Sequence, residues 1–215
     1  MRVIAGRLRG RNLAAPKSQS IRPTADRLRE SLFNTLMHAY GDPVSGARVL
    51  DLFAGTGALG IEAISRGAAY CLFVDDGAEA RALLRQNVET LGLAGVTRIF
   101  RRDAATLGPA HPIEPFSLVF ADPPYGKDLG TRAILSARDG GWLAPGALID
   151  LATDPSRAGM GQASASVLEP EFGYDQRYEH AIARIRGDMH DLLSVPEASV
   201  EMLKGFAASG KAMRA

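Results

Sequence analysis

Predicted strands and helices alternate between residues 48 and 152 of this 215-residue chain. Strands joined through helices pair in parallel by right-handed crossovers, with helices on both faces of the sheet. We therefore expect a doubly wound α/β fold, whose ligands bind at the carboxyl ends of the strands. Apolar runs predict strands at residues 48–53, 69–74, 97–101, 116–121 and 147–152, and apolar spacing predicts helices at residues 58–66, 78–91 and 129–137.

The composition is that of a single α/β domain with a substantial core, because 46% of the residues are hydrophobic and 23% are charged. The single cysteine, Cys71, excludes an intramolecular disulfide and is expected to be buried. The four histidines lack metal-ligand spacing, so we expect no metal. No run approaches the roughly 20 apolar residues of a membrane-spanning helix, and the start MRVIAG does not resemble a signal peptide. We expect a cytoplasmic protein.

Further segments lie outside the alternating core. Thr24 is expected to cap an amphipathic helix over residues 24–40 that packs on the core and presents Arg27 and Arg29 outward. We expect a loop at residues 155–166, a late strand at 178–186 and a short helix at 196–206. The expected divisions are an N-terminal arm with its helix (1–40), a core domain (41–187) and a tail of unknown role (188–215).

Positive charge is concentrated at the start of the chain. Residues 1–29 hold eight basic residues and one acid, a net charge of +7, so the remaining residues carry −6 of the total of +1. A basic arm on a mildly acidic body is typical of polyanion binding, driven by phosphate neutralisation and counterion release. The alternative is a solvated terminus without a partner.

A glycine-rich turn follows the first predicted strand. The run DLFAGTGALG places Gly55, Gly57 and Gly60 in the spacing GxGxxG, where missing Cβ atoms let a bulky ligand approach the start of a helix. The spacing alone also fits a dinucleotide site or helix packing. Asp51 and Asp75 favour a nucleoside cofactor with an amino-acid end, because they can face its ammonium group and its ribose.

Two more acids belong to the same predicted edge of the sheet. Asp76 is an alternative ribose ligand, or an exposed turn residue. Asp103 follows the third predicted strand, where it can accept a hydrogen bond from an adenine amine or be an ordinary loop acid.

A second motif, Asp122-Pro123-Pro124-Tyr125, follows the fourth predicted strand. The prolines fix the backbone, so the Asp122 carboxylate and the Pro123 carbonyl point into one small space. Two acceptors that engage the N–H bonds of a planar amine aim its lone pair at an electrophilic methyl group. Tyr125 can stack on a flat base. The motif predicts methyl transfer to an amine on an aromatic ring; the alternative is a rigid turn.

Several segments resemble the RsmD-type bacterial small-subunit rRNA guanine-N2 methyltransferases. They are RVIAGRLRGRNLAAP, RPTADRLRESLFN, DLFAGTGALGIEAISRG, FVDD and DPPY, all within residues 1–152. The resemblance implies a Rossmann-like, mostly parallel, seven-stranded sheet with a late antiparallel strand and a basic N-terminal extension. It also implies S-adenosylmethionine as methyl donor, and methylation of one guanine amine of 16S rRNA within an assembling subunit.

The resemblance also implies a division of labour among the site residues. It assigns Asp51 and the turn glycines to the cofactor's amino-acid end, Asp75 to its ribose and Asp103 to its adenine. The family usually has Glu at the position of Asp75, so the adjacent Asp76 remains a second candidate for the ribose. The expected cofactor-binding residues are Asp51, Phe53, Gly55, Thr56, Gly57, Asp75, Asp76, Asp103 and Ala104. The expected catalytic residues are Asp122, Pro123, Pro124 and Tyr125, and the expected RNA-binding residues are Arg2, Arg7, Arg9, Arg11, Lys17, Arg22 and Arg27.

We therefore expect a monomeric, metal-independent rRNA methyltransferase. A DNA amino-methyltransferase is one alternative, although it would need a larger target-recognition region than the stretch after the core. A non-catalytic RNA-binding or assembly factor with a retained cofactor pocket is another, although it would not need the DPPY motif. A nucleotide-dependent dehydrogenase would leave both that motif and the basic arm unexplained.

Overall fold

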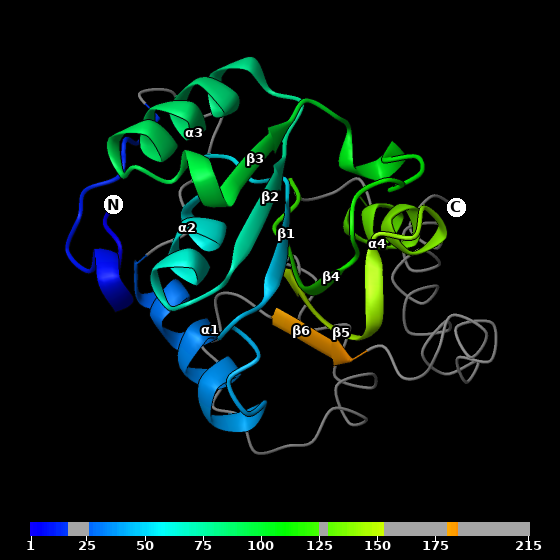
Figure 1. Ribbon diagram of the computed structural model, residues 1–215, viewed down its shortest axis with the longest axis horizontal. Coiled ribbons are helices and arrows are strands. Elements are labelled where there is room, and N and C mark those ends of the chain that lie inside the picture. The colour runs from blue at the N-terminus through cyan, green and yellow to red at the C-terminus, as the bar shows by residue number, and fades with distance from the viewer. Residues whose placement is uncertain (17–25, 125–128, 153–179, 185–215) are drawn as a thin grey trace, which may run out of the picture.

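A computed structural model describes residues 1–16, 26–124, 129–152 and 180–184 (Figure 1). Its α-helices are α1 (Asp26–Ala39), α2 (Ala58–Ser65), α3 (Ala78–Thr90) and α4 (Leu129–Asp139). Its strands are β1 (Arg48–Leu52), β2 (Tyr70–Val74), β3 (Thr97–Phe100), β4 (Phe116–Ala121), β5 (Leu143–Ala152) and β6 (His180–Arg184). Short 3-10 turns are η1 (Gly6–Leu8), η2 (Ala94–Val96) and η3 (Ala104–Thr106).

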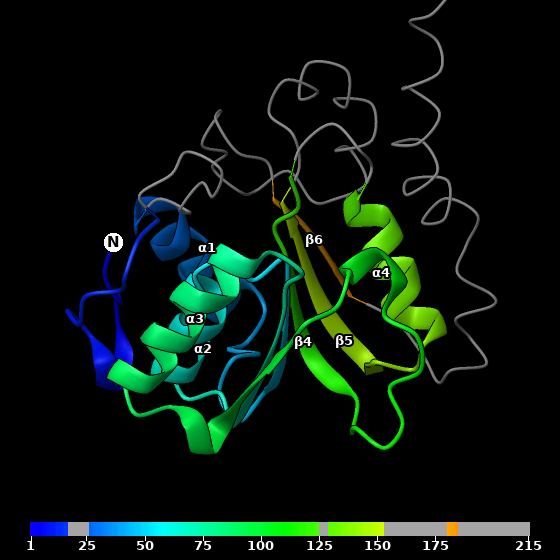
Figure 2. The same cartoon turned by 90° about the horizontal axis from the view of Figure 1, so that it is seen from above.

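The strands form one sheet in the order β3-β2-β1-β4-β5-β6. The first five are parallel to one another, and β6 is antiparallel to β5. Helices α1, α2 and α3 lie on one side of the sheet, and α4 lies on the other (Figure 2). The expected mostly parallel, doubly wound sheet is confirmed. The described residues contain six strands, so a seventh remains an expectation.

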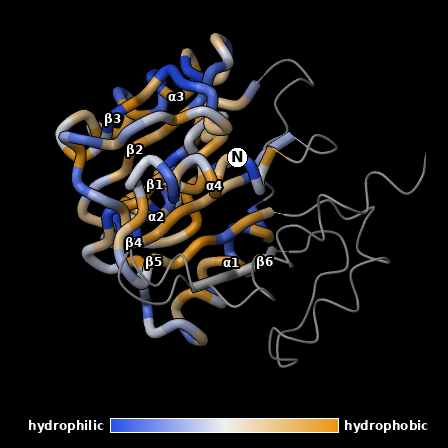
Figure 3. The backbone as a smooth tube through the Cα atoms, turned by 90° about the vertical axis from the view of Figure 1, so that its right-hand side faces the viewer, coloured by the Kyte–Doolittle hydropathy of each residue, from blue (hydrophilic) through white to orange (hydrophobic). Residues whose placement is uncertain are grey.

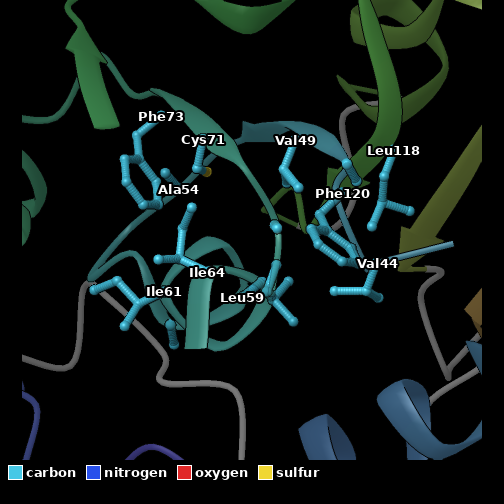
Figure 4. Close-up of a cluster of buried hydrophobic side chains, with 14 of the residues drawn as sticks. Val44, Val49, Ala54, Leu59, Ile61, Ile64, Cys71, Phe73, Leu118 and Phe120 are labelled. Atoms are coloured by element: carbon cyan, nitrogen blue, oxygen red, sulfur yellow. The ribbon is translucent and has the colours of Figure 1, made fainter. Parts of the chain in front are cut away.

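Each face of the sheet buries its own hydrophobic cluster, because successive residues of a strand point to opposite faces. Val49, Cys71 and Phe73 pack with α2 on one face, as Figure 4 shows. Leu50 and Leu72 pack with Trp142 on the other face. The central strands consist largely of hydrophobic residues, whereas much of α3 is hydrophilic (Figure 3). Burial raises the pKa of the Cys71 thiol well above its usual value, in keeping with a packing role.

The first fourteen residues, which we call the N-terminal segment, fold back on themselves. The Val3 amide donates to the Arg11 carbonyl at 2.9 Å, and the Leu13 amide donates to the Met1 carbonyl at 3.1 Å. Val3 and Leu13 join the hydrophobic core. The backbone of this segment is therefore a docked part of the domain, and polyanion binding by its exposed arginines remains a prediction.

Two polar side chains of α2 hold this segment in place. Glu62, almost fully buried, accepts hydrogen bonds from the amides of Ile4 at 2.8 Å and Ala5 at 3.0 Å. Ser65 accepts from the Leu8 amide at 3.0 Å. Because backbone amides at a domain surface otherwise bond to water, these contacts fix the segment in one position.

Helix α1 packs Leu28, Leu32, Phe33 and Leu36 against the core as its spacing predicts. The expectation that it presents Arg29 outward is wrong. Arg29 is fully buried and donates to the Arg2 carbonyl at 2.5 Å and to Asp26 at 3.0 Å. This arginine joins the helix to the N-terminal segment, whereas its neighbour Arg27 is exposed as expected. The predicted cap, Thr24, lies outside the described residues.

Most predicted boundaries differ from the observed ones by one or two residues. The expected start of the fifth strand at Ala147 is wrong, since β5 begins at Leu143. Pro145 and Gly146 lie within β5, near a shift in its register with β4. The predicted loop at 155–166, helix at 196–206 and tail lie outside the described residues. No helix in the described ranges is long and apolar enough to cross a membrane.

Candidate active site

The turn between β1 and α2 requires glycine for two different reasons. Gly55 and Gly57 have φ of 56° and 79°, a left-handed conformation that favours glycine. A Cβ on Gly57 would also lie 2.3 Å from the Leu84 side chain. Gly60 is helical, but a Cβ there would lie 2.5 Å from the Cys71 sulfur, so this third glycine allows α2 to pack on β2.

The residue at the start of this turn, Phe53, is also left-handed with φ of 60°. For a residue other than glycine this conformation costs of the order of 1 kcal/mol or more, and such residues often occur at functional sites. Phe53 is the first residue after β1, which ends at Leu52. Its partly buried side chain packs against the hydrophobic cluster that contains Trp142. The backbone therefore changes direction abruptly where the predicted cofactor turn begins.

Asp51 is a buried acid on β1, with a relative exposure of 2%. Its Oδ2 accepts a hydrogen bond from the Gly60 amide at 2.9 Å. Burial raises the pKa of Asp51 well above its usual value; the Gly60 hydrogen bond opposes this, and the charges of Asp122 and Asp75 add to it. The site thus holds a carboxylate that a nearby cation would stabilise.

Asp75 connects the ends of β1 and β2. Its Oδ2 accepts from the Gly55 amide and its Oδ1 from the Gly77 amide, both at 2.8 Å. Burial raises the pKa of Asp75, and these hydrogen bonds oppose the shift. Asp76 is exposed, so only the first acid of the pair is held against the glycine-rich turn.

Arg81 of α3 is a site residue that sequence analysis missed. It is 7% exposed, and its Nη1 donates to the backbone carbonyls of Asp75 (3.4 Å) and Asp76. Burial and the charge of Asp76 raise the pKa of Asp75, and the hydrogen bonds from the Gly55 and Gly77 amides, followed by the Arg81 charge, lower it. The helix AEARALLRQNVET holds two arginines, and nothing in the sequence separates buried Arg81 from exposed Arg85.

Asp103 and Ala104 lie at the end of β3. The Asp103 carboxylate is exposed and accepts from the Ala105 amide at 2.8 Å, which starts η3, whereas Ala104 is buried. With the strand order β3-β2-β1-β4, acids therefore occur at the carboxyl ends of four adjacent strands. They are Asp103, Asp75, Asp51 and Asp122.

The second motif begins where β4 ends. Leu52 of β1 pairs with Ala121, so Asp122 is the first residue after β4 and lies near enough to Asp51 for their charges to interact. Pro123 is buried beside the first turn of α4, where a Cβ on Gly130 would lie 3.2 Å from its ring. Pro124 is exposed, and Tyr125 lies outside the described residues.

Asn87 of α3 links the cofactor turn to the N-terminal segment. Its amide nitrogen donates to the Thr56 carbonyl at 2.9 Å, and its Oδ1 accepts from the Ala14 amide at 2.7 Å. Thr56 itself is buried, with its hydroxyl 4.0 Å from the Met1 sulfur. The predicted RNA-binding residues in the described ranges, Arg2, Arg7, Arg9, Arg11 and Arg27, are all exposed. Lys17 and Arg22 lie outside those ranges.

The described residues contain no group of His, Cys, Asp and Glu side chains arranged to hold a metal ion.

The model of the family described as Conserved hypothetical protein 95 matches residues 1–167. The chain belongs to this family. Named relatives support the assignment.

Ribosomal RNA small subunit methyltransferase D of Escherichia coli is 42% identical over 149 residues, which cover 69% of this chain and 72% of the relative. The protein of the same name in Haemophilus influenzae is 35% identical over 159 residues, covering 73% and 80%. A solved structure of a candidate methyltransferase from Escherichia coli has a TM-score of 0.67 at 30% identity and covers 87% of this chain and 99% of its own. The expected resemblance is confirmed.

Proposed function

We propose that this member of the family transfers a methyl group from S-adenosylmethionine to the exocyclic N2 amine of a guanine in small-subunit rRNA, and releases S-adenosylhomocysteine. The observation that supports this most directly is the Asp122-Pro123 pair beside buried Asp51 at one edge of the sheet. The names of the relatives suggest the substrate class. We further propose that the protein acts as a cytoplasmic monomer on rRNA or an assembling subunit.

The residues around the glycine-rich turn suit this methyl donor. Buried Asp51 would gain from an ammonium group beside it, because burial and two neighbouring acids disfavour its charged form. Each carboxylate oxygen of Asp75 accepts one hydrogen bond from a backbone amide and keeps a lone pair for a ribose hydroxyl. Gly55 and Gly57 supply the left-handed backbone that turns the chain tightly beside these acids. When bound, S-adenosylmethionine supplies an electrophilic methyl group on a positively charged sulfur.

The acceptors after β4 would prepare the amine. The Asp122 carboxylate and the Pro123 carbonyl would accept hydrogen bonds from the two N–H groups of the guanine N2. These bonds favour a pyramidal nitrogen, whose localised lone pair points at the methyl group. The Asp122 charge would also stabilise the positive charge that develops on the nitrogen before its proton leaves. Asp122 therefore acts on the acceptor, and Asp51 and Asp75 on the donor.

The direct test is methyl transfer from radiolabelled S-adenosylmethionine to small ribosomal subunits, free rRNA and DNA in parallel. The modified nucleotide is then identified by mass spectrometry. We expect label in small-subunit rRNA, as N2-methylguanine. Label in DNA alone would favour a DNA amino-methyltransferase, and cofactor binding without transfer to any acceptor would favour an assembly factor.

Replacing Asp122 with Ala should reduce kcat by about 10²-fold or more, because the amine loses an acceptor present in the transition state. Cofactor affinity should change little, since Asp122 is assigned to the acceptor. Single-turnover methyl transfer and calorimetric titration with S-adenosylhomocysteine measure the two effects. Asp139→Ala, an exposed acid of α4 paired with Arg138, is the control. Full activity in Asp122→Ala would refute the assigned role.

A further inference from the structure

Arginine side chains stack on aromatic rings across β1, β2 and β3. The Arg48 Cζ lies 4.8 Å from the centre of the Tyr70 ring, and the Arg98 Cζ lies 4.7 Å from that of Phe100. The Arg102 Cζ lies 5.4 Å from the same Phe100 ring. We call these five residues the arginine–aromatic strip.

The register of the strands places the strip on one face of the sheet. Arg48 pairs with Tyr70, and Arg98 and Phe100 pair with Leu72 and Val74. Tyr70, Leu72 and Val74 are alternate residues of β2, so they point to the same face. This is the Trp142 side of the sheet, opposite the face that packs on α2. The strip runs diagonally from the start of β1 to the end of edge strand β3.

Two arginines, in β3 and just beyond its end, carry charge that no acid among the described residues neutralises. Arg48 forms an ion pair with Glu114 at 3.3 Å, and Arg102 donates to the Leu107 carbonyl. Exposed Arg98, and Arg101 just beyond it, have no ion-pair partner among the described residues. These two cations stand out on a body whose net charge beyond residue 29 is −6.

We propose that Arg98 and Arg101 bind the sugar–phosphate backbone of the RNA substrate. This inference rests on the proposed function. A guanidinium stacked flat on a ring still directs its N–H groups outward in its plane, which suits phosphate oxygens. The Phe100 ring fixes Arg98 in advance, so less side-chain entropy is lost on binding.

The end of β3 lies close enough to Asp122 for one RNA molecule to contact both. Arg101 and Arg102 directly precede Asp103, at the same edge of the sheet as Asp122. With about 4.8 Å between strands, β3 and β4 lie roughly 14 Å apart. A structured RNA with its target guanine at Asp122 can therefore contact the end of β3. The N-terminal segment, which packs on α2, provides its arginines from the other side of the sheet.

The experiment measures binding of in vitro transcribed small-subunit rRNA to the full chain at several salt concentrations. The double variant Arg98→Gln, Arg101→Gln should bind about tenfold more weakly, and the slope of log K against log salt should fall by about 2, near one for each phosphate contact. Arg85→Gln, an exposed arginine of α3 on the other face, is the matched control and should leave the slope unchanged. Phe100→Leu keeps both charges and should weaken binding while preserving most of the slope.

The outcomes separate this surface from the proposed function. Unchanged affinity and slope in the double variant, while the wild type methylates rRNA, would overturn the surface alone. The arginines would then serve only to keep an edge strand from pairing with other sheets. A wild type that neither binds nor methylates rRNA would overturn both. Retained binding of S-adenosylhomocysteine in each variant shows that the domain is folded.

Discussion

At the residue scale, the charged form of Asp51 lowers the stability of the fold and is also the form that would bind the cofactor's ammonium group. Its pKa is raised in the fold, mainly by burial, so the folded protein holds a proton more tightly than the unfolded chain does. The free energy of unfolding should therefore fall as pH rises above the unfolded value near 4 and through the raised pKa. The charged form of Asp51 costs free energy in the folded protein, and a bound cation can offset that cost.

Asp51→Asn should therefore stabilise the protein at neutral pH, by the order of 1 kcal/mol, and make its stability less dependent on pH. The Asn oxygen can still accept from the Gly60 amide. Urea unfolding at pH 5 and pH 8 measures both effects, and calorimetry should show greatly weakened cofactor binding. A loss of stability at neutral pH would show that the Asp51 carboxylate is well compensated in the fold.

Arg81→Ala should weaken cofactor binding by about tenfold, because the carbonyls of Asp75 and Asp76 lose the guanidinium that holds them. We expect a higher KM for the cofactor with little change in kcat, and partial rescue in Arg81→Lys. Exposed Arg85→Ala on the same helix is the control. An equal effect of both variants on KM would exclude a specific positioning role.

At the scale of elements, the N-terminal segment depends on one close approach. Gly6 has φ of 76°, and a Cβ there would lie 1.9 Å from the Ser65 carbonyl oxygen of α2. Gly10 has a nearly equal φ of 80° but open space around its Cα. The two glycines therefore carry a similar conformational requirement, and only Gly6 carries the steric one.

Gly6→Ala should destabilise the protein by more than 2 kcal/mol, while Gly10→Ala should cost about 1 kcal/mol. Urea unfolding of the two variants measures the difference. If both cost the same, the contact with α2 contributes nothing beyond the left-handed conformation.

Elements with a clear hydrophobic period were predictable, and single polar residues were not. The strands β2 and β4 are nearly continuous apolar runs because both of their faces are buried, and β1 has Val49, Leu50 and Leu52 around the buried Asp51. The start of β5 was missed because Pro145 and Gly146 usually break a strand, but both occur at irregular positions. Glu62, a lone acid in the apolar helix ALGIEAIS, was an available signal of a buried contact.

The same limit applied within the site. The turn glycines and the acids after the strands were predictable, because strand ends of a parallel sheet meet at one edge. Buried Arg29 and Arg81 were not, since an arginine in an amphipathic helix is usually exposed. Both bind backbone carbonyls, which a sequence pattern does not display, and Asp26 is the one side-chain partner of Arg29 that the spacing could have suggested.

At the scale of the whole molecule, charge is separated between the N-terminal region and the body. Because Val3 and Leu13 belong to the core, deletion of the segment would damage folding as well as charge. Substitution of exposed side chains separates the two effects.

Arg7→Gln with Arg9→Gln should lower the slope of log K against log salt for rRNA by about 2 and leave thermal stability nearly unchanged. Binding isotherms over a salt series and a thermal melt provide the two readouts. An unchanged slope would show that these arginines are solvated and contact no phosphate.

The hydrogen bonds that hold the N-terminal segment also impose an order in time. The segment is synthesised before α2 and α3, and its partners Glu62 and Asn87 follow 58 and 73 residues after Ile4 and Ala14. At typical translation rates of about 5–20 residues per second, these two intervals span roughly 3–15 s. A segment rich in arginine thus leaves the ribosome well before its docking site exists, so the sequence made first completes the domain late.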